Sequence, residues 1–92
     1  MLERYLPLGS VVKIKENAHL YMITGRMMSY ENENGEIISK DYHAVLYPFG
    51  VLNTNEQIMF NHDQIEKMLF IGYQDFREAA FQKELEKHRN DE

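Results

Sequence analysis

The sequence contains no cysteine in its 92 residues, which excludes a disulfide framework, a cysteine nucleophile, an iron–sulfur cluster and a cysteine-ligated zinc site. The basic start and apolar run of a signal peptide are missing from the first residues, and no apolar stretch approaches the roughly 18 residues of a transmembrane helix. These absences predict a soluble, cytoplasmic protein that has no membrane partner.

Positive charge is also scarce. Ten Lys and Arg residues stand against fifteen Asp and Glu residues, which gives a net charge of −5. A protein that binds the phosphate backbone of nucleic acid usually presents a basic surface. The six Tyr and five Phe residues would suit base stacking, but a barrel that stacks bases also needs a positive groove. The sequence therefore predicts no nucleic-acid partner.

What is present is the composition of a small globular domain. Hydrophobic residues make up 43% of the chain and charged residues 27%, which are ordinary values for folded domains. A chain of this length has room for one hydrophobic core. We expect a single domain over residues 1–92, with a β-rich core over 1–74 and a C-terminal helix over 75–92.

Hydrophobic periodicity predicts five short strands. They cover residues 11–15, 20–28, 37–47, 57–60 and 68–72. Asn34–Gly35 between the second and third strands predicts a hairpin closed by a type I′ turn. Gly25 inside the second strand predicts a β-bulge. The run from Met68 to Gly72 is apolar throughout, which is typical of a buried strand.

Two helical segments are predicted from their capping residues. Asn61, with Gln64 three residues later, predicts a capped helical turn from His62 to about Lys67. Asp75 predicts the N-cap of the terminal helix, with Glu78 at the capping-box position. That helix has a limited apolar side and a highly charged end whose last turns we expect to fray. Its apolar side consists of Phe76, Ala79, Ala80, Phe81 and Leu85.

Short strands joined by tight turns and followed by one helix predict an α+β fold. The expected architecture is a small, mainly antiparallel, strongly curved β-sheet or SH3-like barrel of about five strands, with a short helical turn and a C-terminal helix. The alternative is an antiparallel sheet of about three to five strands with the helix packed on one face. The predicted core positions are Val12, Ile14, Met22, Val45, Leu46, Ile65, Leu69 and Ile71.

Candidate catalytic residues are few. The four histidines show no zinc-site spacing. Asp41 and His43 would point to the same side of a strand, so that with His62 they are candidates for a metal or acid–base site. The alternative is a polar pair on the wet face of the sheet. Because the sequence also lacks a nucleophile elbow and a glycine-rich phosphate loop, it predicts no enzyme, no catalytic residue, no cofactor and no bound metal.

The most informative surface candidate is the segment from Tyr47 to Leu52. Tyr47-Pro48-Phe49-Gly50 fits a type I turn with proline at its second position, which places Phe49 at the tip. A large apolar side chain there either folds back as a plug of the core, which burial statistics favour, or is exposed to a partner. The candidate protein-binding residues are Tyr47, Pro48, Phe49, Val51 and Leu52.

Three blocks of the sequence, taken in order, resemble a known family. They are Leu6-Pro-Leu-Gly-Ser-Val-Val12 with Gly25-Arg26, then Asp41-Tyr42 with Leu46-Tyr-Pro-x-Gly50, then Phe60-Asn-His-Asp-Gln-Ile65 with Phe70-x-Gly-Tyr-x-Asp75. This combination resembles domain of unknown function 4176 (DUF4176) over about residues 5–78. Its members are small proteins of Gram-positive bacteria, often encoded beside type VII secretion toxins of the LXG class.

The resemblance implies a function but no active site. Some members of the family are thought to be cytoplasmic targeting partners of those toxins. We therefore expect a non-enzymatic adaptor whose partner is another protein, either a secreted toxin or a product of the same operon. The alternatives are an immunity-type inhibitor of a toxin and a metal-dependent hydrolase that uses Asp41, His43 and His62. The oligomeric state is left open.

Overall fold

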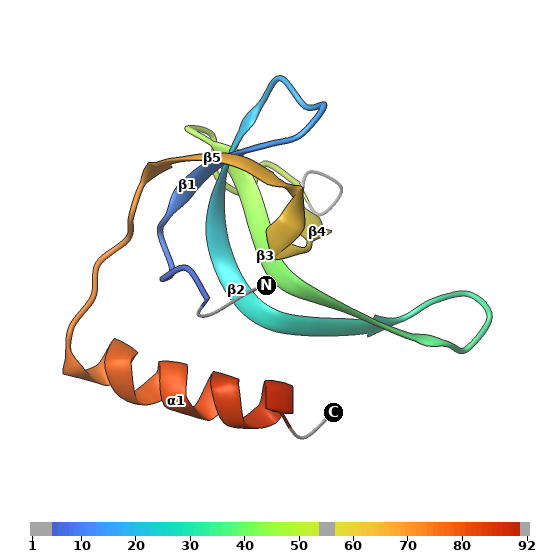
Figure 1. Cartoon of the computed structure of the whole chain (residues 1–92). Coiled ribbons are helices and arrows are strands. Elements are labelled where there is room, and N and C mark those ends of the chain that lie inside the picture. The colour runs from blue at the N-terminus through green and yellow to red at the C-terminus, as the bar shows by residue number, and fades with distance from the viewer. Residues whose placement is uncertain (1–4, 54–56, 91–92) are drawn as a thin grey trace.

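The structure is a computed structural model, which describes residues 5–53 and 57–90 of the chain. Its elements are β1 (Val11–Ile14), β2 (Leu20–Glu31), β3 (Ile37–Tyr47), β4 (Ile58–Phe60), the 3₁₀ turn η2 (His62–Gln64), β5 (Ile65–Phe70) and α1 (Phe76–Asn90). The five strands form one antiparallel sheet in the order β4-β3-β2-β1-β5 (Figure 1). The predicted α+β class is confirmed.

The sheet is strongly curved and open. Figure 1 shows β2 and β3 bending together, with their hairpin reaching out beyond the rest of the sheet. The register of β2 against β3 shifts between Ile23 and Gly25, which confirms the predicted bulge. Within the described residues, β4 pairs with β3 and β5 pairs with β1, and no ladder joins β4 to β5. The curved-sheet version of the prediction is therefore correct and the closed barrel is not.

The hairpin between β2 and β3 is confirmed, but its turn is not type I′. Gly35 has a φ of 80°, whereas Asn34 stays outside the left-handed region. Gly35 N donates to the Asn32 carbonyl at 3.0 Å, and Asn32 N donates to the Glu36 carbonyl at 2.9 Å. This is a type I turn followed by a left-handed glycine. The Asn32 side chain favours it, because Oδ1 accepts from the backbone N–H of both Asn34 and Glu36.

The core lies on one face of the sheet. Its buried members are Tyr5, Val12, Ile14, Tyr21, Ile23, Tyr42, Ala44, Phe60 and Leu85. Of the predicted core positions, Val12 and Ile14 belong to it, Val45 is buried elsewhere, and Met22, Leu46 and Ile65 are partly buried. Leu69 and Ile71 were predicted wrongly, because they are 49% and 45% exposed.

The segment between β4 and β5 differs from its prediction in length. Asn61 N donates to Gln64 Oε1 at 2.8 Å, which confirms the capping interaction. The helical turn ends at Gln64, however, rather than near Lys67, and β5 begins at Ile65. Lys15 N donates to the Gln64 carbonyl at 2.9 Å, so pairing with β1 takes over directly after the turn. The strand predicted at 68–72 therefore starts three residues earlier.

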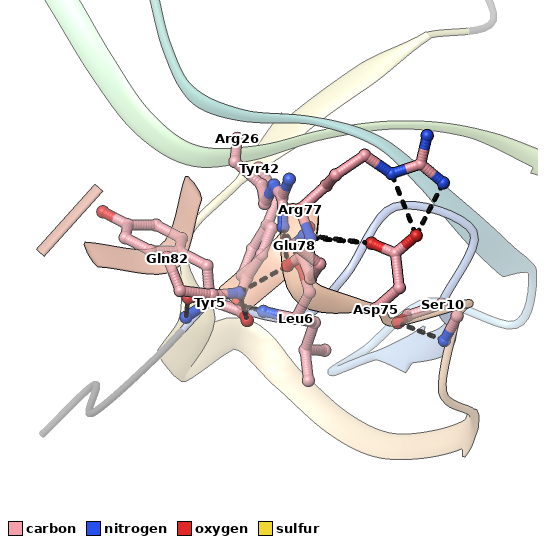
Figure 2. A network of polar contacts seen from close by, with 10 residues as sticks. Tyr5, Leu6, Ser10, Arg26, Tyr42, Asp75, Arg77, Glu78 and Gln82 are labelled. Carbon is pink, nitrogen blue, oxygen red and sulfur yellow. Dashed lines mark hydrogen bonds and ion pairs between the residues drawn. The ribbon is translucent and has the colours of Figure 1, made fainter. Parts of the chain in front are cut away.

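Helix α1 is attached mainly by polar contacts (Figure 2). Arg26 on β2 forms an ion pair with Glu78, and Gln82 Nε2 donates to the Tyr5 carbonyl at 2.6 Å. Asp75 is the N-cap as predicted, because its Oδ1 accepts from Arg77 N at 2.9 Å. The predicted apolar side is wrong except for Leu85: Phe76, Ala79, Ala80 and Phe81 are exposed.

The link from β5 to α1 passes close to the N-terminal segment. Gly72 N donates to the buried Ser10 Oγ at 3.0 Å. A Cβ atom on Gly72 would lie 2.0 Å from the Leu8 carbonyl oxygen, so only glycine fits there. In Figure 1 the chain runs down the outside of the molecule between β5 and α1, which leaves β5 uncovered by the helix.

Candidate protein-binding surface

The segment Tyr47–Leu52 forms an exposed apolar turn. Phe49 is 61% exposed, and both Val51 and Leu52 are 62% exposed. Tyr47 is about half exposed, and Pro48 is also exposed. The favoured prediction, that Phe49 folds back as a plug of the core, is therefore wrong.

The geometry of this turn explains why its side chains point outward. The Tyr47–Pro48 peptide is cis, and Gly50 N donates to the Leu46 carbonyl at 2.7 Å. The predicted type I turn, which would pair Gly50 with Tyr47, is not formed. A bridge between Leu46 and Gly50 closes the loop one residue earlier. Pro48 and Phe49 then lie beyond the last pair of β3 with β2, which is Tyr47 with Leu20, so no neighbouring strand covers them.

An apolar groove lies beside this turn on the outer face of the sheet. It has a volume of about 460 Å³. It is lined by Gly9, Val11, Leu20, Met22, Tyr47, Leu69 and Phe70. Of the predicted binding residues, only Tyr47 reaches it. The structure thus joins the predicted turn to a larger apolar surface that the sequence did not reveal.

The register of the sheet explains how this groove is assembled. Val11 is paired with both Met22 and Phe70, and Leu20 is paired with Tyr47. Paired residues of antiparallel strands point to the same face. Val12 and Ile14 point into the core, so Val11 and its partners point to the other side. The apolar surface therefore crosses four neighbouring strands.

One sequence pattern in β5 pointed to an exposed strand, but the apolar composition of the rest of that strand suggested a buried one. The run Met68–Ile71 is apolar, so it resembles a buried strand, but all four of its side chains are about half exposed. The charged pair Glu66–Lys67 at the start of the same strand is the pattern of an exposed edge. Leu20, Met22, Leu69 and Phe70 are the surface residues that the sequence did not identify.

The outer face also carries a small basic cluster. Lys13 is paired in register with Lys67, and Lys13 Nζ lies 2.6 Å from Glu66 Oε2. The hydrogen bond from Lys13 lowers the pKa of Glu66, and the charges of Lys13, Lys15 and Lys67 act in the same direction. One lysine therefore contacts this carboxylate and two more act on it by charge, in a chain whose net charge is −5.

The candidate metal and acid–base residues are held in separate polar contacts. Asp41 Oδ2 accepts from His62 N at 2.8 Å. The ring of His43 lies between Thr24 Oγ1, at 2.7 Å from Nδ1, and Gln57 Oε1, at 2.6 Å from Nε2. In the described part of the chain, no group of three or more acidic and histidine side chains is arranged to hold a metal ion.

His62 has a structural contact with the core. Its Nδ1 lies 2.8 Å from the hydroxyl of Tyr42. Burial raises the pKa of Tyr42 to about 12, so the phenol keeps its proton at neutral pH. The same hydroxyl accepts from Leu6 N at 2.9 Å. This pair ties the N-terminal segment and η2 to β3.

A second hollow, also of about 460 Å³, lies between the N-terminal segment and the start of α1. It is lined by Leu8, Arg26, Tyr73, Asp75, Arg77, Glu78 and Phe81. The Arg26 guanidinium carbon lies 5.0 Å from the centre of the Phe81 ring. Because Arg26 and Glu78 meet here, this hollow belongs to the attachment of α1. It is more polar in character than the groove beside Tyr47.

These features define a small α+β domain with an open curved sheet and an apolar surface on its outer face. The family model described as "Domain of unknown function (DUF4176)" matches residues 5–81, and the chain belongs to this family. Comparison with curated proteins gave no match, and comparison with solved structures gave none either. Among the described residues, no helix is long and apolar enough to cross a membrane.

Proposed function

We propose that this protein is a non-enzymatic adaptor that binds another protein through the turn Tyr47–Leu52 and the neighbouring groove. The observation that carries the proposal is the exposure of Phe49, Val51 and Leu52 together in one turn. Contiguous exposed apolar side chains are typical of interaction surfaces. Aromatic side chains suit such a surface because they offer a large contact area with only two torsions to immobilise.

The family suggests the kind of partner. DUF4176 proteins are often encoded beside type VII secretion toxins of the LXG class. We propose that the partner is such a toxin or a product of its operon, and that the complex forms in the cytoplasm before secretion. An immunity-type inhibitor would use the same surface, so the two roles are separated by their effect on toxicity.

Co-expression of this chain with each protein encoded beside its gene tests the proposal, the expected partner being an LXG-class toxin. We expect the two proteins to co-purify, and we expect the double substitution Val51→Ser and Leu52→Ser to abolish co-purification. Ile37→Ser is the matched control, because Ile37 is similarly exposed but lies at the far end of β3. Failure to recover any operon product, or equal recovery with the double variant, would count against the proposal.

A toxicity assay in the same strains distinguishes escort from inhibitor. An escort leaves the toxin active in the cell and increases the amount secreted. An inhibitor restores growth when the toxin is expressed. We expect increased secretion without restored growth.

A further inference from the structure

The groove on the outer face has the form of a site for one α-helix. We propose that it binds an amphipathic α-helix of the partner protein, with acidic residues at the end of that helix that lies over Lys13, Lys15 and Lys67. This inference rests on the proposed function, because it specifies how the partner is recognised.

The two walls of the groove come from β3 and from the edge strand β5, with β2 and β1 between them. Tyr47, at the end of β3, forms one wall. Leu69 and Phe70 form the other. Phe70 is paired with Val11 and Met68 with Val12, so Leu69 is an extra residue in a β-bulge. A bulge of this kind re-aims a side chain, and both Leu69 and Phe70 line the groove.

The spacing of the walls fits a helix. From Tyr47 to Phe70 the surface crosses β3, β2, β1 and β5. Three interstrand spacings amount to about 14 Å. A helix with its side chains is about 10–12 Å across, so it fills this width, whereas one extended strand does not. Val11 and Met22 form an apolar floor for side chains spaced at i, i+3 and i+7.

The edge of β5 is poorly suited to the other common mode of recognition, which is strand addition. Its pairing with β1 shifts register twice, between Val11 and Val12 and again between Lys13 and Ile14. Bulges in an edge strand interrupt the regular row of donors and acceptors that an added strand needs. The apolar face of the sheet is therefore the better docking surface.

The lysines beside the groove indicate which residues the bound helix should carry at one end. Lys13 and Lys67 are paired on the same face as Val11 and Phe70. Lys15 lies in the turn after β1, where its charge acts on Glu66, and Glu66 is the acidic residue in direct contact with Lys13. A partner with Asp or Glu at this end would gain complementary contacts and faster association.

A displayed library of amphipathic helical peptides, with randomised residues at both ends, is the probe. We expect panning against the full chain to enrich peptides with acidic residues at one end. Their binding, followed by fluorescence anisotropy, should weaken about tenfold with Phe70→Ser and with Lys67→Glu, and it should weaken as salt is raised. Phe76→Ser and Lys83→Glu on α1 are matched controls, because both side chains are exposed. Amide shifts in the NMR spectrum should localise to β1, β2 and β5.

Several results would overturn the inference. These are the absence of any enriched peptide, enrichment of extended or proline-rich sequences, binding that Phe70→Ser and Lys67→Glu leave unchanged, and a dimer in sedimentation that buries the groove. If the toxin still co-purifies in a manner that depends on Val51 and Leu52, only the helix inference fails. If co-purification also fails, the adaptor function fails with it.

Discussion

Arg26 and Glu78 form an ion pair that joins β2 to α1 with only 4% of the Arg26 side chain and 12% of the Glu78 side chain exposed. Among residues 76–88 of α1, Leu85 is the buried apolar side chain. The helix is therefore attached through buried polar groups and one apolar anchor. Glu78 also accepts a hydrogen bond from Gln82 Nε2 at 2.7 Å. The Glu78 carboxylate therefore contacts both Arg26, on β2, and Gln82, which donates to the Tyr5 carbonyl.

Removing one partner of this pair should weaken the attachment. We expect Glu78→Ala to lower the free energy of unfolding by about 3 kcal/mol, because it leaves the Arg26 guanidinium buried without its counter-ion. Urea denaturation followed by circular dichroism measures the change. The double substitution Arg26→Met and Glu78→Leu is the control, and it should recover most of the loss. Equal losses in the single and double variants would show that the pair is not the cause.

The close approach at Gly72 gives a second prediction. We expect Gly72→Ala to cost more than about 2 kcal/mol of stability, because the new methyl group would overlap the Leu8 carbonyl. Gly35→Ala is the control. It also carries a backbone penalty, from its φ of 80°, but its Cβ would lie 3.7 Å from Glu31 Oε1, which is an ordinary van der Waals contact. We expect it to cost only about 1 kcal/mol in a thermal melt. A smaller effect at Gly72 than at Gly35 would contradict the steric explanation.

The elements that local patterns define were predicted well. The density of β-branched and aromatic residues identified β3 with its observed limits, Ile37 and Tyr47. Asp75 marked the start of α1, because an N-cap depends on residues within one turn. The Asn-Gly hairpin and the bulge at Gly25 were found for the same reason.

The features that depend on distant contacts were not predictable in this way. The position of α1 depends on Arg26 and Glu78, which are 52 residues apart. Because α1 is held away from β5, the apolar run Met68–Ile71 is exposed rather than buried. The groove requires β3, β2, β1 and β5 to be neighbours, and only the strand order brings them together. The turn Tyr47–Leu52 was identified from its composition, but its exposure depends on closure at Leu46.

The buried phenol of Tyr42 predicts a loss of stability in alkali. Its pKa is raised from 10.0 to about 12, so the unfolded chain releases this proton at lower pH than the folded chain does. The contribution is fully present below about pH 10 and is lost as the pH rises to about 12, up to about 2.7 kcal/mol. Urea denaturation at pH 9 and at pH 11 measures the part of this loss that falls between the two pH values. Tyr42→Phe should be less stable at pH 9, because it leaves Leu6 N without its acceptor, but should lose less on moving to pH 11.

The last prediction separates recognition from folding at Phe49. Because this side chain is 61% exposed, Phe49→Ala should change the free energy of unfolding by less than about 1 kcal/mol. If the turn is the anchor of the interface, the same substitution should weaken partner binding by about 2 kcal/mol or more. A thermal melt and a calorimetric titration with the purified toxin measure the two effects. Phe76→Ala, at an exposed aromatic on α1, should change neither. A stability loss of about 3 kcal/mol or more, the amount typical of a buried phenylalanine, would contradict the exposed position of Phe49.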